Sequence, residues 1–189
     1  MCKTLKGKNV AILLTDGFEQ VEMTEPRKAL TEAGARAFLV SPKDGKVQGY
    51  HHDQKADEFP VDVPLAEADP ENFDALVLPG GVANPDALRI MDEAIAFIKA
   101  FHDEGKPIAA ICHGSWPLIE AGVVSGKTLT SWPSLQSDLR NAGGKWVDWE
   151  VVSDNGLITS RKPDDLPVFN RRIIEEFAKT PAELITEPV

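Results

Sequence analysis

A short run in the middle of the chain places a cysteine between an apolar segment and a helix. Residues 107–111 are Pro-Ile-Ala-Ala-Ile, and residues 112–115 are Cys-His-Gly-Ser. Residues 116–122 predict a helix that ends on a glycine. A strand that turns sharply into a helix at a nucleophilic side chain is a nucleophile elbow, which lifts that side chain above the sheet and directs backbone N–H groups at it. The run therefore predicts an α/β fold with a reactive Cys112.

The alternative for Cys112 is a structural role, since free cysteine is among the most buried residue types. Two features of the neighbouring sequence favour a nucleophile instead. Ala110 and Gly114 stand two residues to either side of Cys112, where a tight turn needs small residues. A helix also begins directly after the cysteine, and its N–H groups and dipole favour a thiolate.

The rest of the chain alternates between strands and helices. Residues 10–14, 37–40 and 73–78 are continuous apolar runs of the kind that form buried parallel strands. A helical pattern covers residues 19–33, with a kink or break expected at Pro26. This β-α-β order predicts a mostly parallel sheet with helices on its faces.

The remaining segments fit a single domain over residues 1–189, the size of one ordinary globular unit. A hairpin, or short strands with a polar loop over the sheet, is expected within 41–64. The other expected elements are helices at 88–101, 134–142 and 163–178, strands at 127–131, 146–147, 151–153 and 157–160, and an extended tail at 180–189.

Composition excludes several classes of partner. The formal charge is −10 and the isoelectric point is near 4.9, which argues against nucleic acid and anionic membranes. No apolar run approaches the ~20 residues that span a bilayer, and the N-terminus lacks the apolar core of a signal peptide. Two cysteines do not make a disulfide framework, and a reactive thiol needs a reducing compartment. A cytoplasmic protein is expected.

The positions of the histidines restrict the catalytic arrangement. The chain has four histidines, and none follows the elbow: His51, His52, His102 and His113. The usual α/β-hydrolase order, with a late histidine, is therefore excluded. The base that serves Cys112 must be His113, a carboxylate or an upstream histidine.

Three loops are expected to meet at the carboxyl edge of the sheet, where open α/β sheets bind ligands. They are residues 16–19, 79–81 and 112–113. Glu19 is the natural carboxylate neighbour of Cys112, although an acid in the first turn of a helix is also favoured by the helix dipole alone. The backbone N–H groups of Gly80, Gly81 and His113 are candidates for an oxyanion hole.

Three ordered motifs carry a family resemblance. They are Asp-Gly-Phe-Glu at 16–19, Leu-Pro-Gly-Gly at 78–81 and Ala-Ile-Cys-His-Gly at 110–114. In this order they resemble the PfpI/DJ-one superfamily, and more narrowly its PfpI-like branch of intracellular proteases and general stress proteins. The resemblance implies a flavodoxin-like three-layer α/β sandwich. It also implies Cys112 as nucleophile and Glu19 as the acid hydrogen-bonded to it.

The PfpI-like proteases imply further site residues. In them His113 would be the base, oriented by a carboxylate from a neighbouring subunit of a homodimer or homohexamer. This chain offers Asp86 for that acid, in a segment one residue longer than the protease pattern and with aspartate in place of glutamate. Trp132 stands where relatives have tyrosine or histidine near the thiol, so it is expected to help bind substrate.

Three functions follow from these residues. The first, implied by the resemblance, is glyoxalase or deglycase chemistry on small reactive aldehydes or glycated substrates. In this reaction Cys112 adds to a carbonyl and Glu19 moves a proton. No metal or nucleotide cofactor is expected. The second is an oligomeric cysteine peptidase with a Cys112–His113–Asp86 triad. The third is a non-enzymatic redox sensor or stress chaperone, in which Cys112 is oxidised.

Overall fold

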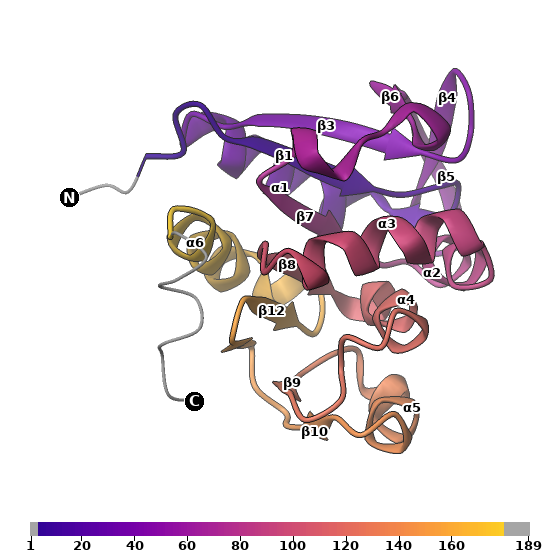
Figure 1. Cartoon of the computed structure of the whole chain (residues 1–189). Helices are drawn as coiled ribbons and strands as arrows, with labels where there is room; N and C mark the ends of the chain where they lie inside the picture. The colour runs from indigo at the N-terminus through magenta and orange to yellow at the C-terminus, as the bar shows by residue number, and fades with distance from the viewer. Residues whose placement is uncertain (1–3, 180–189) are drawn as a thin grey trace.

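The computed structural model describes residues 4–179, and a seven-stranded sheet runs through the centre of this region (Figure 1). All neighbouring strands are parallel except the first pair. Their order is β11 (Val151–Asp154), β12 (Leu157–Ser160), β8 (Ile108–Ile111), β7 (Ala75–Leu78), β1 (Asn9–Leu13), β3 (Arg36–Ser41) and β6 (Val63–Pro64). The predicted α/β sandwich with a mostly parallel sheet is confirmed.

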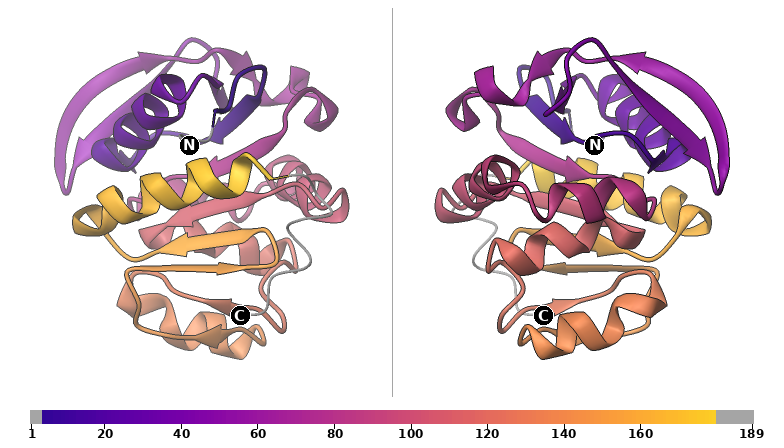
Figure 2. Two further views of the ribbon diagram at one scale, coloured as in Figure 1. Left: turned by 90° about the vertical axis from the view of Figure 1, so that its left-hand side faces the viewer. Right: turned by 90° about the vertical axis from the view of Figure 1, so that its right-hand side faces the viewer.

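Helices cover both faces of this sheet, as the two views of Figure 2 show. On one face, α1 (Gln20–Glu32) packs beside α6 (Leu166–Phe177). The opposite face carries α2 (Ala83–Leu88), α3 (Asp92–Asp103) and α4 (Trp116–Glu120). Short 3₁₀ turns complete the helical set: η1 (Leu65–Glu67), η2 (Pro70–Asn72), η3 (Cys112–Ser115), η4 (Pro133–Leu135) and η5 (Pro163–Asp165).

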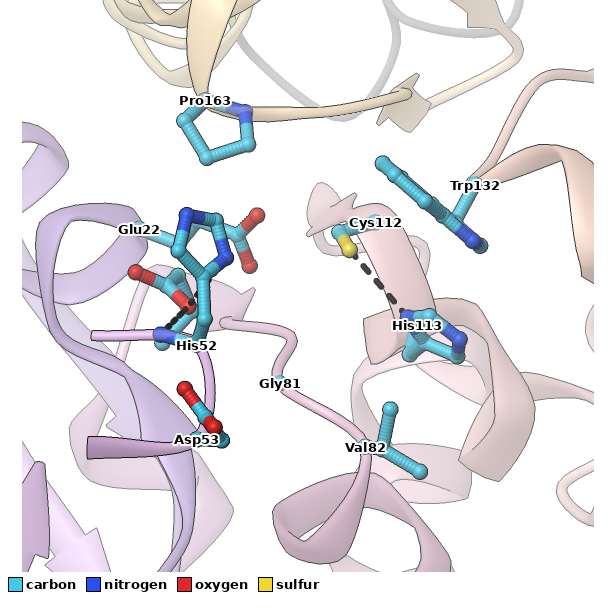
Figure 3. Close-up of a pocket in the computed structure, with 10 residues that line it drawn as sticks. Glu22, His52, Asp53, Gly81, Val82, Cys112, His113, Trp132 and Pro163 are labelled. Carbon is cyan, nitrogen blue, oxygen red and sulfur yellow. Dashed lines mark hydrogen bonds and ion pairs between the residues drawn. The ribbon is translucent and has the colours of Figure 1, made fainter. Parts of the chain in front are cut away.

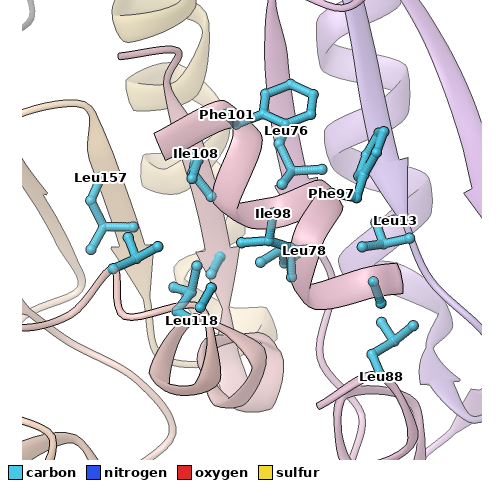
Figure 4. Close-up of a cluster of buried hydrophobic side chains, with 14 of the residues drawn as sticks. Leu13, Leu76, Leu78, Leu88, Phe97, Ile98, Phe101, Ile108, Leu118 and Leu157 are labelled. Carbon is cyan, nitrogen blue, oxygen red and sulfur yellow. The ribbon is translucent and has the colours of Figure 1, made fainter. Parts of the chain in front are cut away.

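A hydrophobic core lies on each face of the main sheet, and successive side chains of each central strand contribute to the two cores in turn. In β1, Ala11 and Leu13 face the α3 side, and Val10 and Ile12 face the α1 side. Because successive strand side chains point to opposite faces, a strand that is buried on both faces is a continuous apolar run. The α3 side holds the aliphatic and phenylalanine cluster of Figure 4.

Two smaller sheets flank the main one. The antiparallel hairpin of β4 (Lys46–His51) and β5 (Gln54–Pro60) joins β2 (Phe18–Glu19), which pairs with β4 in parallel. The hairpin predicted within 41–64 is therefore confirmed, and its turn consists of His52 and Asp53. The second small sheet pairs β9 (Thr128–Leu129) with β10 (Lys145–Trp146), next to α5 (Gln136–Asn141).

Some element boundaries differ from the prediction. The helix expected at 88–101 is divided into α2 and α3, because Met91 is extended and Asp92 begins a new helix. Ile90 continues the apolar helical spacing of this segment in the sequence, but it lies in the break and is 82% exposed. Helix α1 continues through Pro26, which removes one backbone donor without ending the helix. The tail predicted at 180–189 lies outside the described residues.

No helix within residues 4–179 is long and apolar enough to cross a bilayer.

Candidate active site

The chain makes the predicted elbow where β8 ends. Cys112 has φ +60°, a left-handed conformation that is uncommon for any residue except glycine. The chain then enters η3 and α4. Gly114 allows this turn to lie against the end of β7, since a Cβ at this position would overlap the carbonyl group of Leu78. The strained backbone holds the thiol at the carboxyl edge of the sheet.

The Cys112 thiol is nearly enclosed, with the residue only 7% exposed. Its Sγ lies 3.2 Å from Nδ1 of His113. The backbone N–H groups of His113 and Gly81 interact with the sulfur and favour its charged form. Burial outweighs them and, together with the neighbouring carboxyl of Glu22, raises the pKa of the thiol above its ordinary value. Burial therefore works against the thiolate that the helix dipole favours, and ionisation of Cys112 needs a base that takes the thiol proton.

His113 is placed to take that proton. Burial lowers the pKa of its imidazole, so the ring is neutral and Nδ1 can accept from the thiol. With the proton of the neutral ring assigned to Nε2, this atom points at Oγ of Ser134, 3.5 Å away. The ring stacks on Trp132 at 5.9 Å and meets the edge of Trp116 at 5.2 Å. These aromatic contacts fix the orientation of the imidazole.

The carboxyl beside the thiol belongs to Glu22, and the prediction that Glu19 makes this contact is wrong. Glu22 is fully buried, and its carboxyl interacts with the Cys112 thiol. Oε2 accepts a hydrogen bond of 2.9 Å from the Gly80 N–H, whereas Oε1 has no hydrogen-bond partner within residues 4–179. Burial raises the pKa of Glu22 to about 8. Two buried acids in contact cannot both ionise easily, so the pair carries at most one negative charge near neutral pH.

Helix geometry explains why Glu22 takes this place. The buried stripe of α1 repeats every four residues, through Glu22, Pro26 and Leu30. Side chains of a helix also lean toward its N-terminus, which here points at the sheet edge. Glu19 precedes the helix and instead accepts a 3.0 Å hydrogen bond from the His52 N–H. A carboxylate on an otherwise apolar helix stripe was the signal in the sequence that identifies Glu22.

A pocket of about 430 Å³ opens above the thiol (Figure 3). In this view Glu22 and His52 lie on one side, and Cys112, His113 and Trp132 lie on the other. The residues that form its wall come from the elbow, from the first loop and α1, from the hairpin turn and from the loop before α6. They are Glu19, Glu22, His52, Asp53, Gly81, Val82, Cys112, His113, Trp132 and Pro163.

Five of the predicted site residues line this pocket, and two do not. Cys112, Glu19, His113, Gly81 and Trp132 are part of the wall. The N–H of Gly80 is occupied by Glu22, so it does not belong to an oxyanion hole in this arrangement. Asp86 is exposed on α2 and is not among the lining residues. Its contribution to the site of a neighbouring subunit stays a prediction.

The raised pKa of Glu22 predicts a pH-dependent stability. Between pH 4.5 and 8 the folded chain keeps the Glu22 proton while the unfolded chain releases it, so the free energy of unfolding falls as the pH rises through this window. Between pH 5 and 9 we expect the free energy of unfolding of wild type to fall by on the order of 2–4 kcal/mol more than that of Glu22→Gln. Urea denaturation of both proteins across this range measures the difference. A constant difference would show that Glu22 does not retain its proton in the fold.

The fold and the site define an α/β protein with a cysteine nucleophile elbow, in which the thiol is in contact with a histidine and a buried glutamate. The chain belongs to the DJ-1/PfpI family, whose model matches residues 8–176. This confirms the family that the three motifs indicated.

Relatives match over most of their length. The chain is 42% identical to Deglycase TK1284 of Thermococcus kodakarensis, over 88% of this chain and 97% of that protein. It is 42% identical to the putative cysteine protease YraA of Bacillus subtilis, over 87% of this chain and 95% of the relative. General stress protein 18 of the same organism is 44% identical, with the same coverage. The crystal structure of DJ-1beta from Drosophila melanogaster superposes with a TM-score of 0.83 and 31% identity, over 94% of this chain and 95% of that one.

Proposed function

We propose that this protein is a cysteine-dependent enzyme that converts small α-oxo aldehydes, such as methylglyoxal, into hydroxy acids. The observation that carries the proposal is the contact of one thiol with two proton-transfer groups. His113 lies 3.2 Å from Sγ, and the Glu22 carboxyl interacts with the same sulfur. A carbonyl compound that enters the pocket would meet a nucleophile, a base and an acid together.

The first step adds the thiol to the aldehyde. Sγ forms a bond to the aldehyde carbon while the carbonyl π bond breaks, and the thiol proton passes through Nδ1 of His113 to the new alkoxide. The product is a hemithioacetal, and no oxidant is consumed. The Gly81 and His113 N–H groups, which point at the sulfur, are also placed to stabilise negative charge that develops next to it.

The second step moves a proton between adjacent carbons. Glu22, as carboxylate, removes the hydrogen from the former aldehyde carbon and gives an enediolate. The same proton returns to the neighbouring carbon, and the hydroxyl proton of the first carbon passes to the oxygen of the second, which leaves a thioester on Cys112. Water then cleaves the thioester, so that methylglyoxal and one water become lactate and the free thiol. A carboxyl with a pKa of about 8 can both take and return a proton near neutral pH.

The comparisons support this class of reaction. Two relatives at 42–43% identity are named deglycases, from Thermococcus kodakarensis and Pyrococcus abyssi. Another relative, at 44%, is named a general stress protein. A deglycase removes carbonyl-derived adducts, a reaction to which the thiol chemistry proposed for this pocket is suited, whereas the stress-protein name specifies no reaction.

The test is to incubate the protein with methylglyoxal, without added thiol or metal, and to follow lactate by proton NMR. We expect lactate to form catalytically and in equal amount to the methylglyoxal lost. Protein alkylated beforehand with iodoacetamide should form none. Consumption of methylglyoxal without lactate would mean that the protein only traps the aldehyde, and would overturn the proposal.

A peptidase is the second candidate, favoured by the 3.2 Å contact of Cys112 with His113 and by the name of YraA. It would need Asp86 of another subunit to reach Nε2 of His113, which here faces Ser134. Cleavage of a fluorogenic peptide library, lost in both Cys112→Ala and Asp86→Ala, would support it. Oxidation of Cys112 by mild peroxide, without turnover of aldehyde or peptide, would support the redox sensor instead.

A further inference from the structure

Three acidic side chains line the thiol pocket. Glu19, Glu22 and Asp53 line it, and none of the described residues in its wall is a lysine or arginine. We infer that the pocket selects carbonyl compounds with a positive charge remote from the reacting carbon and rejects those with a carboxylate, and that Glu19 and Asp53 determine this selection. That the ligand contains a reacting carbonyl group rests on the proposed function. That the rest of the ligand carries a positive charge rests on the acidic side chains of the wall.

Glu19 presents a fixed carboxylate. Its side chain is only 12% exposed, and Oε2 is held by the His52 N–H at 3.0 Å. The Nδ1 atoms of His51 and His52 lie 4.0 and 3.9 Å from its two oxygens. Among the described residues, no lysine or arginine forms an ion pair with Glu19. A cation in the pocket would then be attracted to Glu19, and an anion would be repelled.

Asp53 extends the acidic wall outward. It lies in the β4–β5 turn and has no ion-pair or hydrogen-bond partner in the described part of the chain. Together with His52 and Val82 it also lines a second hollow of about 350 Å³, next to Tyr50 and Asp16. Asp16 is already paired with Lys43 at 2.5 Å, so the uncompensated charge in this hollow is that of Asp53. A ligand bound at the thiol can therefore reach this hollow by passing Asp53.

Glu22 supplies independent evidence that a ligand belongs in the pocket. It is fully buried, yet Oε1 lacks a hydrogen-bond partner within residues 4–179. Buried polar atoms rarely remain unpaired, so we expect a group of the ligand to supply the missing hydrogen-bond partner of Oε1. The raised pKa of Glu22 keeps a proton on the carboxyl, which can donate to a ligand carbonyl. The reacting oxygen is thus expected at Glu22, and the charged substituent near Glu19 and Asp53.

Matched thiol reagents of opposite charge test this selection without any turnover. In a Cys2→Ser background, Cys112 is the single thiol. At pH 8 it is treated with one of two methanethiosulfonate reagents, which carry either a cationic ethyltrimethylammonium group or an anionic ethylsulfonate group. In each case the sulfur displaces methanesulfinate and forms a disulfide with the thioethyl group, so that only the charge differs. The intact mass of the protein, followed over time, gives the rate at which each reagent modifies Cys112. The ratio of these two rates is then divided by the ratio measured for the same reagents with free cysteine.

We expect the cationic reagent to be favoured by at least tenfold in the parent protein. Glu19→Gln and Asp53→Asn should each lower that preference about threefold, as expected for one unit charge in a partly screened pocket. Glu32→Gln is the matched control. It removes the same charge at the far end of α1, roughly 20 Å away at 1.5 Å per residue, and should leave the preference unchanged.

Two results would overturn the inference. One is a preference that does not respond to Glu19→Gln and Asp53→Asn, or that responds equally to Glu32→Gln. The other is a Cys112 that neither reagent modifies, since the pocket would then be closed to charged ligands. Lactate formation from uncharged methylglyoxal is independent of this preference. Failure of charge selection and failure of the aldehyde reaction are therefore separate outcomes.

Discussion

Replacing Cys112 with serine is expected to lower lactate formation from methylglyoxal by at least about a thousandfold. Serine keeps the size and the left-handed backbone of the elbow, but its hydroxyl loses a proton far less readily than a thiol. His113 is neutral and close to the nucleophile, yet one imidazole cannot activate a hydroxyl in a pocket where burial already raises the pKa of the thiol. The hemithioacetal and the thioester cannot form without the sulfur. Steady-state lactate production measured by proton NMR checks the loss.

The matched control for this variant is Cys2→Ser, which changes the other cysteine of the chain. It should retain full activity. Thermal unfolding of both variants should stay close to wild type, because neither substitution changes side-chain volume appreciably. Equal activity of Cys112→Ser and wild type would mean that the reaction takes place elsewhere, and would remove the basis for the proposed mechanism.

Replacing Gly114 with alanine is expected to destabilise the fold by roughly 3–5 kcal/mol. The added Cβ would overlap the Leu78 carbonyl and come within 3.0 Å of the Pro79 oxygen. Both obstacles are backbone atoms, so no side chain can move aside to make room. The elbow would have to separate from the end of β7, which would break the contact that positions Cys112. Urea denaturation at constant pH measures the loss.

Gly122→Ala distinguishes this overlap from the general effect of a glycine substitution. Gly122 has φ +72° and open space around its Cβ position, so alanine there strains the backbone by about 1 kcal/mol without a collision. We expect Gly114→Ala to be several times more destabilising than Gly122→Ala. Similar values for both would show that close packing against β7 does not constrain the elbow.

Much of the fold was predictable because its signals are local. The apolar runs at 10–14, 73–78 and 107–111 were identified as strands, since strands buried on both faces leave no polar positions. The hairpin and the final helix were also predicted. The division of the helix at 88–101 was missed, because Ile90 continues the apolar spacing although it lies in the break.

The candidate site was only partly predictable. Cys112 and His113 are adjacent in the sequence, so the motif alone places them together. The position of Glu19 directly after the first strand favours it as the neighbour of the thiol, but the helix phase brings Glu22 there instead. Trp132 was expected near the thiol from the family pattern, whereas nothing in the sequence indicated that Ser134 would face His113.

Short runs of apolar and small residues are enough to predict the parallel α/β architecture and the nucleophile elbow. The acid that meets the thiol, and the direction in which the pKa of each group shifts, follow only from the assembled fold. The first depends on which residue the helical phase of α1 directs at the sheet edge, and the second depends on how completely the pocket excludes water. Burial raises the pKa values of Cys112 and Glu22 together, and burial is a property of the assembled fold rather than of any segment.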